Sequence, residues 1–226
     1  MVDGEKINAI RTVKNDHGIC AYSVFKDYII LAYPSKTVGT IQINNLPLSS
    51  EVIGEEKELA CHNNPISMLK MNLNGTLLAS VSRTGQNIKI YDINTLVLLY
   101  DFRRGSEMAE ICNMEFCEDN KYFICTSNRC TLHIFYLTGA NAQDDRKKNP
   151  VKFFEKISSV VKKIGDDKYV TKQSSFAQIK FETPSICAVY DQNKVIAINS
   201  FGCLIGEFNE EKGGEGAFSS ISDFTH

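Results

Sequence analysis

An internal repeat with a period in the mid-forties most constrains the fold of this chain. The segment LLAS at 77–80 aligns with FICT at 123–126, a separation of 46 residues, and IKIY at 88–91 aligns with LHIF at 132–135, a separation of 44. Each copy contains a turn, a short apolar strand, a second turn and an alternating strand. Several short strands in a unit of this length are typical of a β-propeller blade, so the repeat predicts an all-β fold.

Two further copies flank this pair. The segments 28–32 and 39–43 form an earlier copy, and 195–198 with 203–208 form a later one. The four copies predict a partial β-propeller over 1–226 with about four four-stranded blades, at approximately 18–60, 61–101, 106–181 and 182–226. Between Cys125 and Ala197 the spacing stretches to 72 residues, which places an insert within 138–175.

Composition limits the classes of function. The chain has 226 residues, 43% of them hydrophobic, and 25 Lys+Arg against 27 Asp+Glu give a net charge of −2. A globular protein with this balance has no overall attraction to nucleic acid, so we expect none as a partner. The sequence predicts no leading secretion segment, no membrane span and no Cys-x-x-Cys pair, which favours a reducing compartment.

Neither a metal site nor a cofactor is predicted. A zinc site remains conceivable, but its spacings are unusual and its members fall in strand-like runs. Those members would be Cys112, Cys117, Cys125, Cys130 and His133. An enzyme has little support, because no nucleophile stands with a base and an orienting partner.

The insert is basic and amphipathic. Between positions 146 and 163 it has seven basic residues and one acidic residue. Its apolar side chains recur at helical spacing, which predicts a helix from about 152 to 164. Such a helix either docks on its own domain or enters a membrane interface. For the second case the membrane-inserting residues would be Phe153, Phe154, Ile157, Val160, Val161 and Ile164.

The tetrapeptide Phe102-Arg103-Arg104-Gly105 joins two of the repeats. Neighbouring side chains of an extended strand point to opposite sides, so the two arginines are placed to serve two different partners. Each guanidinium can bind a phosphate through two hydrogen bonds. Two arginines before a glycine are also common in solvated turns, and only the flanking repeats make the binding hypothesis stronger.

Together these features resemble the PROPPIN family of β-propellers, which bind polyphosphoinositides and act in autophagy and endosomal traffic. The resemblance runs from about residue 18 to 208 and is most specific over 62–135. It implies two headgroup pockets for phosphatidylinositol 3-phosphate and phosphatidylinositol 3,5-bisphosphate. The first group of pocket residues would be His62, Ser80, Ser82, Gly85, Lys89 and Arg103; the second group would be Arg104, Gly105, Ser127, Thr131 and His133.

The chemistry of both groups suits a phosphorylated inositol. Cations bind its phosphates, hydroxyls bind its other oxygens, and glycine permits close backbone approach. Each hydroxyl taken singly could equally make a strand-end hydrogen bond, and His133 alone could be an ordinary strand histidine. Gln86 and Lys89 depart from the usual Thr and Arg of the family, and Lys lacks the planar fork, so the first pocket is expected to be weaker.

The resemblance also carries expectations about size and location. PROPPINs have seven blades, which require roughly 300 residues. About four blades should form an open arc whose edges promote self-association, with residues 1–18 and 209–226 poorly ordered. The implied function is a peripheral protein of autophagosomal, endosomal or vacuolar membranes, otherwise cytoplasmic, with autophagy-type protein partners. The alternative is a WD-repeat scaffold that binds proteins without lipid.

Overall fold

The computed structural model describes residues 10–25, 27–48, 54–137 and 172–223, which fold into four successive β-sheets. The first sheet contains β1 (Ala21–Phe25), β2 (Tyr28–Pro34), β3 (Thr40–Pro47) and β4 (Glu56–Ala60). The second contains β5 (Ile66–Met71), β6 (Leu77–Ser82), β7 (Asn87–Asp92), β8 (Leu98–Arg103) and, from beyond the insert, β12 (Lys172–Ser174).

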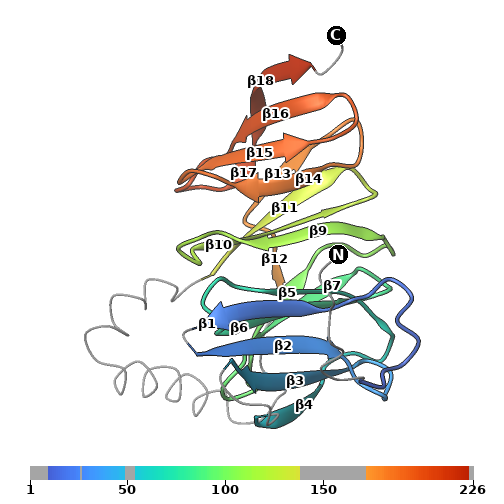
Figure 1. Cartoon of the computed structure of the whole chain (residues 1–226). Coiled ribbons are helices and arrows are strands. Elements are labelled where there is room, and N and C mark those ends of the chain that lie inside the picture. The colour runs from blue at the N-terminus through green and yellow to red at the C-terminus, as the bar shows by residue number, and fades with distance from the viewer. Residues whose placement is uncertain (1–9, 26, 49–53, 138–171, 224–226) are drawn as a thin grey trace, which may run out of the picture.

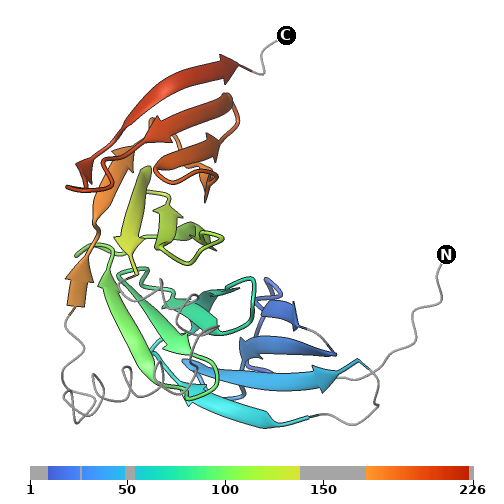
Figure 2. The same cartoon turned by 90° about the vertical axis from the view of Figure 1, so that its left-hand side faces the viewer.

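The remaining strands form the other two sheets. The third contains β9 (Ile111–Phe116), β10 (Tyr122–Ser127), β11 (Thr131–Tyr136), β13 (Ala177–Lys180) and β17 (Gly214–Glu215). The fourth contains β14 (Ile186–Val189), β15 (Lys194–Ile198), β16 (Gly202–Glu207) and β18 (Ala217–Asp223). Figure 2 shows the four sheets following one another in an arc, so the predicted all-β fold of about four blades is confirmed.

Alternating side chains pack each sheet against its neighbours. On β6, Leu78 belongs to the core between the first and second sheets, whereas Val81 belongs to the core between the second and third. A third core, which includes Leu132 and Val195, joins the third and fourth sheets. Because successive strand residues face opposite sides, one strand can contribute to two cores. Both faces of the second and third sheets are therefore buried, and the candidate site residues lie within these strands or in the turns next to them.

Two short parallel strands tie the outer edges of neighbouring sheets together. Before the chain forms β13, the outer strand of the third sheet, β12 pairs with β8 of the second sheet. Before it forms β18 of the fourth sheet, β17 pairs with β13 of the third. In both cases the chain first adds a short parallel strand to the outer edge of one sheet and then continues into the next sheet.

The expected poor order of residues 209–226 is wrong for the described part of this segment. Residues 214–215 form β17, and β18 pairs with β16 over most of its length, so their backbone groups are satisfied by neighbouring strands. Residues 10–18 also make hydrogen bonds: the Val13 N–H donates to the Ser35 carbonyl at 2.9 Å. The predicted helix at 152–164, with its six membrane-inserting residues, lies outside the described residues.

Within the described ranges, no helix is long and apolar enough to cross a bilayer.

Candidate functional site

The two arginines stand at the end of β8, which Phe102 fixes in place. The Phe102 side chain is fully buried and stacks on Phe135 with a centroid distance of 4.4 Å. Arg103 follows on the opposite face and is exposed. In the part of the chain that the structure describes, its guanidinium has no hydrogen bond or ion pair. Arg103 therefore presents an unused cation at the end of the second sheet.

Arg104 is buried, with only 8% of its surface exposed. Its Nε donates to the Gly85 carbonyl at 2.6 Å, and its Nη2 donates to the Glu107 carbonyl at 2.5 Å. Burial is the main cause that lowers the pKa of Arg104 below its usual range. Among the described residues no carboxylate forms an ion pair with this guanidinium. A buried cation held only by carbonyl oxygens is costly unless an anion completes its environment.

The first group converges on one face of the second sheet. Ser80 pairs with Lys89 across β6 and β7, and Arg103 pairs with Asn87 across β7 and β8. His62, which precedes β5, places its Nε2 3.1 Å from the Ser80 Oγ. The Lys89 Nζ donates to the Cys61 carbonyl at 2.7 Å. Backbone register thus brings the two cations of this group to the same strand end.

Histidine supplies hydrogen bonding, and no positive charge, at neutral pH. Burial, and then the nearby Lys89 charge, lower the pKa of His62 to about 4. Burial, and then the Arg104 charge, lower the pKa of His133 to about 4. Both imidazoles are neutral at pH 7, so lysine and arginine are the cations available for an anion.

The second group lies on the face of the third sheet that is directed at the second sheet. The fully buried Ser127 Oγ accepts the Arg129 N–H at 3.3 Å, and the Thr131 Oγ1 donates to the Arg129 carbonyl at 3.3 Å. His133 lies one row further along β11, with its Nδ1 3.4 Å from the Ser175 Oγ. Arg104, which follows β8 of the second sheet, lies close enough for its charge to lower the pKa of His133.

The two glycines serve different purposes. Gly85 has φ +63°, and a Cβ there would stand 1.9 Å from the Ala109 carbonyl oxygen, so the turn after β6 requires glycine for the fold itself. Ser82 precedes this turn, with its Oγ 3.1 Å from the Thr84 Oγ1. At Gly105 a Cβ would meet nothing within 4 Å. Open space beside Gly105 is compatible with close approach of a ligand.

Sequence reasoning missed two polar residues of the second group's surroundings, Arg129 and Ser175. Arg129 is exposed, and its Nη2 pairs with the Glu107 carboxylate at 3.2 Å. Ser175 contacts His133 and also accepts a hydrogen bond of 2.7 Å from the Gln178 Nε2. Arg129 follows Ser127 closely and could have been found as a basic turn residue. Ser175 comes after the insert, where no repeat spacing identifies its neighbours.

No metal site is found in the described ranges, where no three His, Cys, Asp or Glu side chains are grouped to hold an ion. All eight cysteines are described and are free thiols, including the four considered for zinc. Burial raises the pKa of Cys125 and of Cys117 to about 12, so both remain protonated and pack as small core residues.

Comparison with known proteins identifies a family that matches most of this chain. The family model described as PROPPIN matches residues 6–178. SVP1-like protein 2 from Debaryomyces hansenii is 36% identical over 118 residues, covering 50% of this chain and 26% of that protein. WD repeat domain phosphoinositide-interacting protein 2 from Gallus gallus is 33% identical over 138 residues, covering 60% of this chain and 31% of that protein. The chain therefore spans about a third or less of the length of these two relatives.

Solved structures agree on the fold. Kluyveromyces lactis Hsv2 with complete loop 6CD aligns with a TM-score of 0.69 at 20% identity, covering 90% of this chain and 62% of that one. A complex of KlAtg21 with the coiled-coil of AgAtg16 aligns with a TM-score of 0.65 at 18% identity, covering 91% and 57%. The four sheets therefore correspond to part of a larger propeller.

Proposed function

The chain belongs to the PROPPIN family of non-enzymatic binding proteins, and on this premise we propose that it binds 3-phosphorylated phosphoinositides at membrane surfaces. The lipids are phosphatidylinositol 3-phosphate and phosphatidylinositol 3,5-bisphosphate. Arg103 would serve the first headgroup site with the rest of the first group, and Arg104 would serve the second site with the second group.

The observation that carries this proposal is the environment of Arg104. Its buried guanidinium is held by two carbonyl oxygens and has no carboxylate ion pair within the described ranges. A phosphate beside it would supply the missing anion through charge-assisted hydrogen bonds. Ser127, Thr131 and the neutral His133 offer further hydrogen-bonding groups nearby. The first group repeats this chemistry with Lys89, Arg103 and Ser80.

The insert would strengthen attachment after the headgroups have bound. Its apolar residues Phe153, Phe154, Ile157, Val160, Val161 and Ile164 would enter the bilayer interface, while its lysines would meet anionic lipids. The protein would then be cytoplasmic and peripheral on autophagosomal, endosomal or vacuolar membranes. A coiled-coil protein of the autophagy machinery is a reasonable partner, because a structural relative is seen in complex with such a segment.

A protein-binding scaffold without lipid binding is the second candidate. The hydrogen bonds from Arg104 to Gly85 and Glu107 favour it, since they give this side chain a structural role in fixing the loop after β8 to the turn between β6 and β7. Under this alternative Arg103 would have no lipid to bind, and its loss would leave membrane association unchanged.

Liposome flotation separates the two candidates. Vesicles contain phosphatidylinositol 3-phosphate or phosphatidylinositol 3,5-bisphosphate, and control vesicles reach the same charge with phosphatidylserine. Arg103→Ala combined with Arg104→Ala should abolish specific flotation, because the loss of each arginine–phosphate interaction costs about 1.5–3 kcal/mol of binding free energy. Arg103→Ala alone isolates the exposed arginine from the structural bonds of Arg104. Circular dichroism verifies folding, and undiminished flotation of the folded double variant would refute the lipid proposal.

A further inference from the structure

The second and third sheets repeat the same outer-strand register. In the second sheet Lys89 of β7 pairs with Asp101, and Asn87 pairs with Arg103 of β8. In the third sheet His133 of β11 pairs with Gln178, and Thr131 pairs with Lys180 of β13. Lys89 and His133 are equivalent in the sequence repeat. Lys180 therefore occupies, in the third sheet, the position that Arg103 occupies in the second.

The short parallel strands support the same equivalence. β12 pairs with residues 101–103 of β8, and β17 pairs with residues 177–178 of β13. In both sheets the basic residue ends an outer strand that pairs with a short tie; β12 reaches Arg103, whereas β17 stops two residues before Lys180. The basic residue also stands in the same row as an inner-strand residue of the candidate site, which is Thr131 in the third sheet.

The two groups differ in the number of permanent cations. The first group contains Lys89 and Arg103, whereas the second contains only Arg104, because His133 is neutral at pH 7. A 3-phosphorylated headgroup carries a phosphodiester charge and a monoester charge of about −1.5 to −2. One arginine leaves most of that charge unmatched. Arg129 lies nearby, but its Nη2 is already engaged by the Glu107 carboxylate and the Met108 carbonyl, so a further cation would complete the site.

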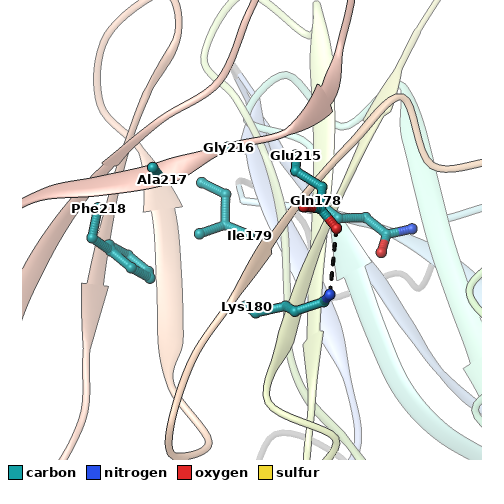
Figure 3. A pocket seen from close by; sticks show the side chains of 7 residues that line it. All are labelled: Gln178, Ile179, Lys180, Glu215, Gly216, Ala217 and Phe218. Atoms are coloured by element: carbon teal, nitrogen blue, oxygen red, sulfur yellow. Dashed lines mark hydrogen bonds and ion pairs between the residues drawn. The ribbon is translucent and has the colours of Figure 1, made fainter.

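Lys180 is available for this role. Its side chain is 73% exposed, and its ion-pair partner is the 82% exposed Glu215, with 3.3 Å between Nζ and Oε1. Figure 3 shows this pair beside Gln178, at an open cavity of about 270 Å³ that these residues help to line. Exposed ion pairs are weak and exchange readily, because water screens both charges. A phosphate can therefore replace the Glu215 carboxylate.

We propose that Lys180 is the second cationic ligand of the headgroup site at Arg104, with Glu215 as its counter-ion in the absence of lipid. This inference rests on the proposed function and extends it to the outer strand that follows the insert. Ser175, which contacts His133 just before this strand, lies on the same side of the sheet and contributes a hydroxyl. The second group, like the first, would then include two permanent cations.

The test isolates the second site with Arg103→Ala and measures binding of the soluble headgroup inositol 1,3-bisphosphate by calorimetry. Lys180→Gln in this background should weaken binding by at least about tenfold, as expected for a lost charge-assisted hydrogen bond. Glu215→Gln should leave the affinity equal or higher. In the chain with Arg103 intact, Lys180→Gln should spare one of the two sites.

Lys212→Gln is the matched control. It removes an exposed lysine from the turn at 209–213. Glu210 of this turn pairs with Lys121, just before β10 begins, whereas the candidate site residue Ser127 lies at the other end of β10. This variant should bind like its background. Equal affinity with and without Lys180 would overturn the inference, and so would an equal loss in the Lys212 variant. If the unmodified chain binds no headgroup, the proposed function fails and this inference fails with it.

Discussion

Replacing Gly85 by alanine tests whether the turn between β6 and β7 is locked against the loop that follows Arg104. The new Cβ would stand 1.9 Å from the Ala109 carbonyl oxygen and 3.0 Å from its carbon, both backbone atoms that cannot rotate away. The residue also has φ +63°, which L-amino acids adopt at a cost of about 1–2 kcal/mol.

The magnitude follows from the bonds that the displaced turn would lose. The Ala109 N–H donates to the Thr84 carbonyl at 3.1 Å, and a neutral bond of this kind contributes about 1 kcal/mol. The Arg104 Nε donates to the Gly85 carbonyl, and a bond from a charged group contributes about 1.5–3 kcal/mol. With the backbone strain included, Gly85→Ala should lower the free energy of unfolding by about 3.5–6 kcal/mol.

Urea denaturation followed by circular dichroism measures this loss, with two glycines as controls. Gly18 has φ +60° and open space around it, so Gly18→Ala should cost only the backbone strain of about 1–2 kcal/mol. Gly105→Ala should change stability by less than about 0.5 kcal/mol, since a Cβ there meets nothing. It should nevertheless weaken headgroup binding, because the methyl group fills space that the ligand would approach. A Gly85→Ala loss no larger than that of Gly18→Ala would refute the reasoning.

Four other outcomes are expected. Phe102→Ala should lower the free energy of unfolding by about 3–5 kcal/mol, because it empties a fully buried site between two sheets, and urea melts that match the unmodified chain would contradict this. The lowered pKa of His133 contributes stability that is full above pH 6.5 and falls as pH drops towards 4, and His62 contributes in the same way, so His133→Asn should reduce but not abolish the loss of urea stability between those pH values, and an unchanged loss would contradict this. Replacing Phe153, Phe154 and Ile157 by Asp should weaken liposome flotation and spare binding of the soluble headgroup; equal losses would make the insert a structural part of the domain. The open arc should self-associate through its free edges, and light scattering that shows only monomer would oppose this.

Local repeats account for how much of the fold could be predicted. Strands joined by short turns keep their spacing in the sequence, so IKIY at 88–91 and LHIF at 132–135 identify β7 and β11. The parallel ties β12 and β17 contain three and two residues, and their partners lie far away in the chain. No periodicity can develop in so few residues, so the sequence gives no sign of these ties. Poor order after residue 208 is expected because no first blade is present to complete the last one, whereas the structure pairs this segment with β13 and β16.

The candidate site shows the same limit. Strand alternation explains why Arg103 and Arg104 have different surroundings, because this property depends only on neighbouring residues. Strand alternation does not predict that Arg104 is buried, nor that it donates hydrogen bonds to the carbonyl oxygens of Gly85 and Glu107. Those contacts depend on how two sheets pack together. The pairing of Lys180 with Thr131 likewise crosses the insert, so the sequence distance between them gives no indication of it.

The late arrival of β13 has a consequence for synthesis on the ribosome. The third sheet acquires β9, β10 and β11 in direct succession, but its next strand begins about 40 residues after β11 ends. At 5–20 residues per second, translation leaves the edge of β11 uncovered for about 2–8 s. During that time the nascent chain exposes a strand edge that another chain could pair with. Codon choice and chaperone access within the segment that encodes the insert should therefore affect the yield of folded protein more than the same changes elsewhere.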